Sequence, residues 1–189
     1  AARWLVREGA SSLDQTRVEL VPSGSGDNGL VFVRNRVCNI SHQCMAVAVA
    51  LALSAIHQKG SASSLSPSVC ILGGGGLALP MALLSAEPKL EVLVVEWDSI
   101  ATDLARRFFG AEEPRLHIET ADALAFVAEG GVSQPIATLV IDIDFLRGAP
   151  AVPEALAGSA FWTPAWHAVL AAGNSGGLIL VNSIGAETA

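Results

Sequence analysis

Residues 68–98 have the sequence SVCILGGGGLALPMALLSAEPKLEVLVVEWD. The apolar run Val69 to Leu72 is followed by four glycines, and a second apolar run ends at Glu96. A strand buried on both faces of a parallel sheet has such a continuous apolar run. Glycines after it allow a sharp turn and a close approach of the backbone to a ligand. We interpret this stretch as the opening of a nucleotide-binding strand–helix–strand unit.

Two features of this unit predict a ribonucleoside ligand. Free N–H groups of the glycine turn, at the start of the next helix, are expected to bind an anion. Glu96 lies about twenty residues beyond the last glycine, where an acid can accept hydrogen bonds from ribose hydroxyls. A simple tight turn with a solvated acid at the strand end is the alternative. A dinucleotide also fits, because Gly73, Gly75 and Ala78 match the G-x-G-x-x-A spacing.

The remaining chain alternates expected helices and strands. Strands are predicted at 115–119, 136–141 and 177–181, and Thr163-Pro164 is expected to start the last helix. This alternation predicts an α/β fold with a doubly wound, mainly parallel sheet. Residues 1–40 are expected to form an N-terminal segment with a small β-hairpin, and residues 41–189 the ligand-binding core. Ser41 is expected to cap a helix that is buried.

The composition restricts the partners. The 189 residues are 51% hydrophobic and 15% charged, which is typical of a folded chain. A net charge of −7 without a basic cluster argues against nucleic acid. The apolar run from Met45 to Ile56 is shorter than the roughly twenty residues that span a membrane. Cys38, Cys44 and Cys70 lack metal-ligand spacing, so we expect no metal and reduced thiols in the cytoplasm. The oligomeric state stays open, with a homodimer as one alternative.

Acidic residues follow the later predicted strands. Asp122 comes directly after the third strand of the core, where an adenine amino group could be bound, and Asp142 and Asp144 follow the fourth. Ligands of open parallel sheets bind at the carboxyl ends of the strands. Glycines or acids at four successive strand ends favour S-adenosylmethionine over a nicotinamide cofactor.

These segments together resemble class I S-adenosylmethionine-dependent methyltransferases of the spermidine-synthase-like branch. Within that branch the sequence is most similar to the methyltransferases that modify translation elongation factor 1-alpha on its N-terminal amine or on lysine. The resemblance covers roughly residues 18–183. The matching segments are Cys70-Ile71-Leu72-Gly73-Gly74-Gly75-Gly76-Leu77, Val94-Val95-Glu96-Trp97-Asp98, Ala121-Asp122-Ala123 and Leu139-Val140-Ile141-Asp142-Ile143-Asp144.

The resemblance implies an S-adenosylmethionine-dependent methyltransferase with a protein substrate. Asp142 and Asp144 would attract and orient the amine, Glu96 would hold the ribose, and Asp122 the adenine amine. For Trp97 packing is an alternative, for Gln43 and its neighbour His42 capping or surface polarity, and for Asp144 a cap. The implied cofactor site comprises Gly73, Gly74, Gly75, Gly76, Glu96, Trp97, Asp122, Ala123, Asp142 and Gln43.

Two departures bear on the acceptor. Spermidine synthases have a glutamate where this chain has Cys44, and an Asp-Pro after the strand-four acid that is absent here. A diamine would therefore lose two expected anchors. A polyamine aminopropyltransferase and a catalytically silent homologue that binds a nucleoside or a partner remain alternatives. The family's sheet also continues beyond strand five, so its last strands are expected to be missing from residues 1–189.

Overall fold

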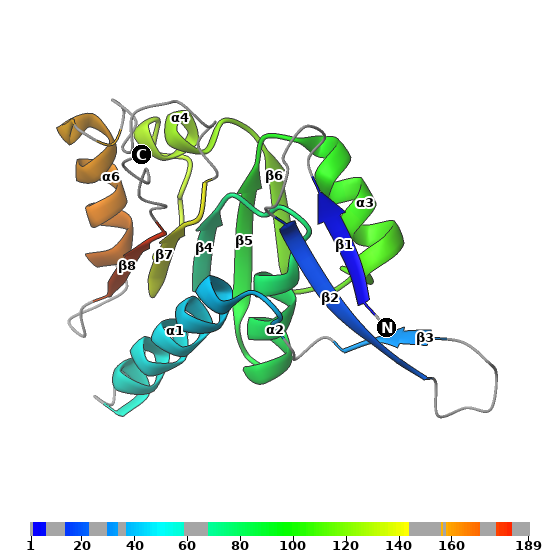
Figure 1. Ribbon diagram of the computed structural model, residues 1–189. Coiled ribbons are helices and arrows are strands. Elements are labelled where there is room, and N and C mark those ends of the chain that lie inside the picture. Colours follow the sequence, from blue (N-terminus) through cyan, green and yellow to red (C-terminus); the bar gives the residue numbers. More distant parts are fainter. Residues whose placement is uncertain are drawn as a thin grey trace, which may run out of the picture.

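The main sheet has five parallel strands in the order β6-β5-β4-β7-β8 (Figure 1). The computed structural model describes residues 2–6, 14–22, 30–33, 37–58, 68–143, 156, 158–170 and 177–182. The order confirms the predicted doubly wound sheet, since the chain runs outward from β4 to one side and then returns to build the other. The strands are β4 (Ser68–Leu72), β5 (Glu91–Glu96), β6 (Leu116–Thr120), β7 (Thr138–Ile141) and β8 (Leu178–Val181).

Helices cover both faces of this sheet. Alternate residues of each strand point to opposite faces, so Val69 and Ile71 pack with α1 and α2, whereas Cys70 and Leu72 lie in the core that includes α4 and α6. These two cores explain why the central strands are apolar throughout. The helices are α1 (Ile40–Gln58), α2 (Ala78–Ala86), α3 (Ser99–Phe109), α4 (Ala123–Ala128) and α6 (Ser159–Leu170).

A separate antiparallel sheet precedes the core. Strand β2 (Asp14–Pro22) pairs with β3 (Leu30–Phe32), which confirms the predicted hairpin. Strand β1 (Ala2–Val6) pairs with the other edge of β2 and was not predicted. The connection at 23–29 lies outside the described residues.

Two predicted helix starts are wrong. Helix α1 is capped by Asn39, whose Oδ1 accepts hydrogen bonds from the N–H and hydroxyl of Ser41 at 2.9 and 2.6 Å. Helix α6 begins at Ser159, with Pro164 inside it. The first turn of α6 is held because Phe161 is buried and packs edge-on against Trp162. Packing therefore outweighs the preference of proline for a helix start.

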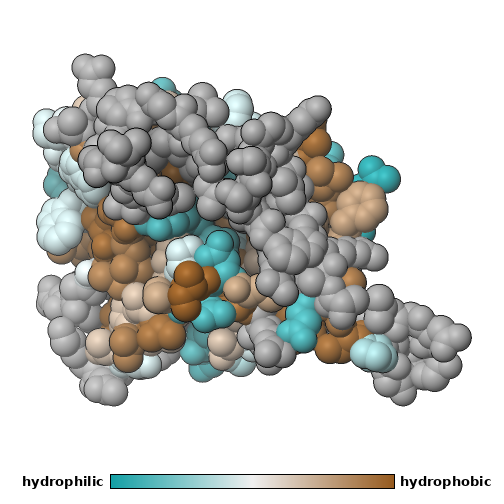
Figure 2. Space-filling view, viewed as in Figure 1, coloured by the Kyte–Doolittle hydropathy of each residue, from teal (hydrophilic) through white to brown (hydrophobic). Residues whose placement is uncertain are grey.

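Helix α1 is only partly buried, contrary to the prediction. Met45, Val49 and Leu53 face the sheet, whereas Val47 and Leu51 are exposed. Figure 2 shows hydrophobic surface over the part of the molecule where α1 and β8 lie. None of the helices in the described part of the chain is long and apolar enough to cross a membrane.

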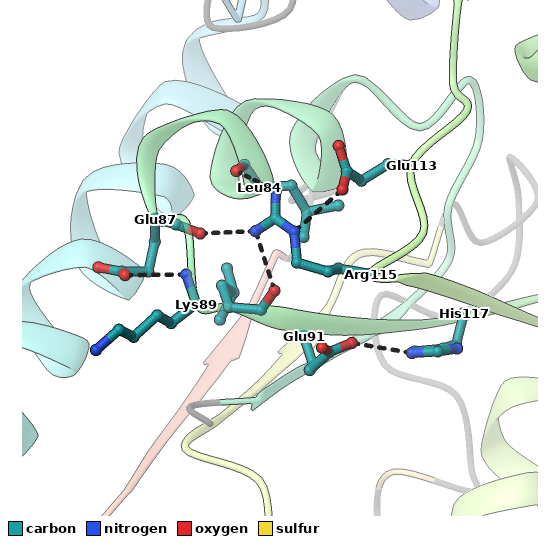
Figure 3. Close-up of polar contacts among 8 residues, drawn as sticks. Leu84, Glu87, Lys89, Glu91, Glu113, Arg115 and His117 are labelled. Atoms are coloured by element: carbon teal, nitrogen blue, oxygen red, sulfur yellow. Dashed lines mark hydrogen bonds and ion pairs between the residues drawn. The ribbon is translucent and has the colours of Figure 1, made fainter. Parts of the chain in front are cut away.

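Arg115 fixes the end of α2 (Figure 3). Its guanidinium donates hydrogen bonds to the carbonyl oxygens of Leu84, Glu87 and Leu90, at 3.0, 2.9 and 3.3 Å. Its Nε donates to Glu113 at 3.0 Å. The last carbonyls of a helix lack partners within the helix, so one side chain ties the end of α2 to the start of β5. The other end of α2 adjoins the glycine turn.

Candidate functional site

The carboxyl ends of the five strands meet at one edge of the sheet, to which their arrowheads point (Figure 1). The chain leaves β4 and β7 in opposite directions at this edge, and such a switch point leaves a crevice for a ligand. Gly73 follows β4 and Asp142 follows β7. The N–H of Asp142 donates to the carbonyl of Leu72 at 2.8 Å, which brings the two strand ends together.

The glycine turn packs tightly against its own chain. Gly73 has a φ of +89°, and a Cβ there would collide with the backbone carbonyl of Asp142. A Cβ on Gly74 would lie 2.6 Å from Cγ1 of Val94. Leu77, at the end of the turn, is buried with a φ of 61°, which is strained for a residue with a side chain. Gly73 and Gly74 are thus required by packing, whether or not a ligand approaches them.

The side chain of Glu96 accepts hydrogen bonds from the N–H groups that were predicted to bind an anion. Its Oε2 accepts hydrogen bonds from the N–H groups of Gly74 and Gly75 at 2.7 and 2.9 Å, and its Oε1 accepts from the N–H of Asp98 at 3.0 Å. The side chain is buried, and these hydrogen bonds replace the contacts with water that its oxygens lose. The prediction of an anion site is therefore wrong for Gly74 and Gly75.

This arrangement selects among ligands by charge. A phosphate at the turn would meet a carboxylate of the same sign, which disfavours it. A carboxylate has about four acceptor positions, and the described contacts of Glu96 use three of them. The remaining acceptor position, on Oε1, is not used by these three contacts. Glu96 is therefore suited to a neutral polyol such as a ribose and not to a pyrophosphate.

Three other predicted cofactor residues lie around the ends of β5 and β6. Trp97 follows Glu96, and 71% of its surface is exposed, which excludes packing in the core. Asp122 caps α4 through Oδ1, which accepts from the N–H groups of Leu124 and Ala125 at 3.0 and 2.8 Å. Its Oδ2 has no partner in the described part of the chain and stays available for a ligand. Ala123 is the first residue of α4.

Asp142 joins three elements that are distant in sequence. Its Oδ2 lies 2.9 Å from Nε2 of His42, in the first turn of α1. Its Oδ1 accepts a hydrogen bond from Nδ2 of Asn182, after β8, at 2.7 Å. Asn182 was not predicted, although it follows a strand in the same way as Asp142. Gln43 turns elsewhere and donates to the carbonyl of Val37 at 2.8 Å.

Asp144, the loop that follows it and possible metal ligands are the remaining candidates at this edge. Asp144 and most of the loop from Phe145 to Ser159 lie outside the described residues. Within the described ranges, no group of three or more histidine, cysteine, aspartate or glutamate side chains could hold a metal ion.

Comparisons with known proteins address the fold. No protein-family model matches the sequence. No curated protein sequence matches it significantly. Among solved structures, human methyltransferase-like protein 13 in complex with SAH is similar over 68% of this chain and 59% of that chain, with a TM-score of 0.54 and 23% sequence identity.

Two spermidine synthases are also similar. A probable spermidine synthase from Corynebacterium glutamicum matches over 81% of this chain and 57% of that chain, with a TM-score of 0.54 and 16% identity. A spermidine synthase in complex with the transition state analogue AdoDATO matches over 80% of this chain and 50% of that chain, with a TM-score of 0.50 and 17% identity. This chain thus spans only 50–59% of the chains of these three proteins. It has the Rossmann-like fold that methyltransferase-like protein 13 shares with spermidine synthases, as the sequence predicted.

Proposed function

We propose that the protein is an S-adenosylmethionine-dependent methyltransferase that acts on a protein amine. The observation that carries this proposal is the carboxylate of Glu96, which is held at the end of β5 by the N–H groups of the glycine turn. It leaves an acceptor for a ribose and repels a phosphate. S-Adenosylmethionine has a ribose and a sulfonium cation but no phosphate. The SAH bound to methyltransferase-like protein 13 supports the same ligand class.

The other residues around the crevice are assigned parts of this ligand. Trp97 offers an exposed aromatic face beside Glu96 on which an adenine can stack. Asp122, which starts α4, keeps Oδ2 for the adenine amine. The turn from Gly73 to Gly76 lies along the methionine portion, whereas Gln43, which donates to Val37, would have to turn to help enclose it.

The acceptor is proposed to be an N-terminal α-amine or a lysine, with elongation factor 1-alpha as the first candidate. This rests on the sequence resemblance and on the acidic end of β7. Asp142 and Asp144 attract the amine as its ammonium. An α-amine has a pKa of about 8 and a lysine of about 10.4, so the α-amine is more easily deprotonated at neutral pH. Transfer then depends mainly on positioning and electrostatics.

The test is incubation of the protein with labelled S-adenosylmethionine and elongation factor 1-alpha, followed by mass spectrometry. We expect a methyl group on the N-terminal amine or on a lysine. Binding of S-adenosylmethionine is measured separately by calorimetry. Absence of binding would contradict the cofactor assignment, whereas binding without methylation would contradict this acceptor and favour a catalytically silent homologue.

A polyamine aminopropyltransferase is the second candidate, because the fold is shared with two spermidine synthases. Cys44, at the position of their expected glutamate, is exposed and offers no carboxylate, which weakens the anchoring of a diamine. Turnover of putrescine with decarboxylated S-adenosylmethionine would support this candidate over the first. No turnover is expected.

Two further assignments complete the proposal. The three cysteines are free thiols, and Cys44 is exposed, which supports a reducing compartment and hence the cytoplasm.

A homodimer is supported by the exposed apolar side chains Ile40, Val47 and Leu51 on α1. Sedimentation velocity of the wild type and of Leu51→Glu tests it, and a monomeric wild type would contradict it.

A further inference from the structure

We propose that His42 is the base that takes the proton from the substrate amine, and that Asp142 and Asn182 hold its imidazole ring in place. This inference rests on the proposed methyltransferase function. His42, Asp142 and Asn182 come from α1, the end of β7 and the end of β8. The fold brings them together across 100 and 40 residues of sequence, with contacts of 2.9 and 2.7 Å.

The contact with Asp142 determines which nitrogen of His42 is free. An ionised carboxylate can only accept a hydrogen bond, so Nε2 of His42 carries the hydrogen that points to Asp142. In the neutral ring Nδ1 then bears the lone pair. No residue in the described part of the chain donates a hydrogen bond to Nδ1. In its neutral form His42 therefore presents the lone pair of Nδ1, with the tautomer fixed by a carboxylate, the same logic as in a catalytic triad.

Both oxygens of Asp142 are already engaged. Oδ1 accepts from Asn182 while Oδ2 contacts His42, and the side chain of Asp142 is only 16% exposed. Such a carboxylate is better placed to orient a ring, and to stabilise its positive charge, than to remove a proton itself. Imidazole exchanges protons readily near neutral pH. The geometry thus indicates different roles for the two residues. Asp142 positions the imidazole ring, and His42 accepts the proton.

The pair adjoins the glycine turn, which is proposed to hold the methyl donor. Asp142 adjoins Gly73 through a backbone contact that leaves no room for a Cβ. The side chain of His42 is 12% exposed, so it is largely shielded from solvent. His42, on α1, thus contacts the residue that adjoins the glycine turn, and the same turn donates hydrogen bonds to Glu96.

The proposed step is balanced in atoms and charge. Nδ1 of His42 accepts a proton from the substrate ammonium, and the electron pair of that N–H bond stays on the amine nitrogen. This pair forms the new N–C bond to the methyl carbon while the S–C bond of the sulfonium donor breaks and sulfur keeps its electrons. The products are a methylated ammonium and a neutral thioether. The proton on His42 then passes to water.

A glutamine in place of His42 distinguishes a role as a base from a purely structural role. His42→Gln retains an N–H that can reach Asp142 but has no basic nitrogen. We expect its kcat with S-adenosylmethionine and elongation factor 1-alpha to fall by about 10²-fold or more, with the affinity for S-adenosylmethionine within about twofold of the wild type. Added imidazole is expected to restore part of the rate of His42→Ala. A wild-type rate for His42→Gln would overturn the proposal.

His117 provides the matched control. Its Nε2 lies 3.0 Å from Oε2 of Glu91, an exposed histidine–carboxylate pair on neighbouring strands (Figure 3). His117→Gln is expected to leave kcat unchanged. An equal loss of rate in His117→Gln and His42→Gln would overturn the assignment to His42.

A spectroscopic readout is independent of turnover. Two-dimensional ¹H–¹⁵N spectra of the imidazole ring are expected to show His42 protonated on Nε2 and unprotonated on Nδ1. The opposite tautomer would overturn the role of His42 while leaving the proposed function intact. Absence of S-adenosylmethionine binding by the wild type would instead overturn the proposed function, and the role of His42 with it.

Discussion

The carboxylate of Glu96 accepts a hydrogen bond from the backbone N–H of Gly74 at 2.7 Å, so the acid at the end of β5 and the turn after β4 form one unit. The same oxygen also accepts from the N–H of Gly75. The acid that is proposed to hold the ribose is therefore oriented by the backbone before any ligand is present. Preorganisation of this kind reduces the ordering that a ligand must impose.

Glu96→Gln is expected to weaken both the turn and the ligand site. A carboxamide has a single acceptor oxygen, so it cannot accept from Gly74 and Asp98 on its two sides at once. We expect the free energy of unfolding to fall by about 1–3 kcal/mol, and the affinity for S-adenosylmethionine by at least about tenfold. Urea denaturation and calorimetry measure the two effects. Glu119→Gln, an exposed change on β6, serves as the control, and unchanged values for Glu96→Gln would contradict this view.

Gly73→Ala and Gly130→Ala form a matched pair. Both glycines have a positive φ, +89° and +77°, but a Cβ on Gly130 would meet nothing within 4 Å whereas one on Gly73 would collide with Asp142. Backbone strain alone costs about 1–2 kcal/mol. We therefore expect about that loss of unfolding free energy for Gly130→Ala and at least about 3 kcal/mol for Gly73→Ala. Equal losses in urea denaturation would argue against the packing role of Gly73.

Arg115→Ala should release the end of α2 from β5. The change removes donors from the carbonyls of Leu84, Glu87 and Leu90, and we expect the unfolding free energy to fall by about 2–4 kcal/mol. Arg115→Lys should recover only part, because an ammonium cannot reproduce the planar fork. Arg106→Ala breaks an exposed pair with Asp103 at 3.9 Å and should change stability by less than about 1 kcal/mol. Similar losses for Arg115→Ala and Arg106→Ala would refute the capping role.

Cys70 is expected to make the free energy of unfolding depend on pH in the alkaline range. Burial in β4 raises the pKa of its thiol from 9.0 to about 12, so above pH 9 the unfolded chain loses a proton that the folded chain retains. The free energy of unfolding therefore keeps its full value below pH 9 and falls as the pH rises toward 12. Relative to Cys70→Ala, the unfolding free energy of the wild type should fall by up to about 1.4 kcal/mol per pH unit in this range. Parallel pH profiles for the two proteins would contradict the buried thiol.

Thiol labelling of the native protein checks the same assignment. Cys44 is exposed and Cys70 is buried. A maleimide should modify Cys44 in the folded protein and Cys70 only in denaturant, because the thiolate is the reactive form. Rapid labelling of Cys70 without denaturant would be incompatible with this structure.

The core strands and the doubly wound arrangement of their sheet followed from local patterns. The runs before Gly73 and Glu96 are apolar throughout because residues on both faces pack against helices, and this pattern survives in the sequence. Helix α1 was less predictable, since Val47 and Leu51 on its exposed side are as apolar as Met45 and Val49 on its buried side. Without a polar face, periodicity cannot tell which side is covered.

The site was predictable as a set of strand ends but not as a network. Glycines and acids after strands indicate which residues share an edge. They do not indicate that Glu96 turns back to Gly74, or that His42 and Asn182 meet at Asp142. These contacts join residues 22, 100 and 40 positions apart, and the last two depend on how α1 and β8 dock on the sheet. Such tertiary contacts leave no local signature.

The close contact between Gly73 and the carbonyl of Asp142 has a mechanical consequence. Side chains can swing, but two backbones in contact without an intervening Cβ can only move together. The spacing between the turn that would hold a methyl donor and the residue that anchors His42 is therefore set by the main chain. Changes in the surrounding helices and loops can alter which acceptor enters while this spacing stays constant.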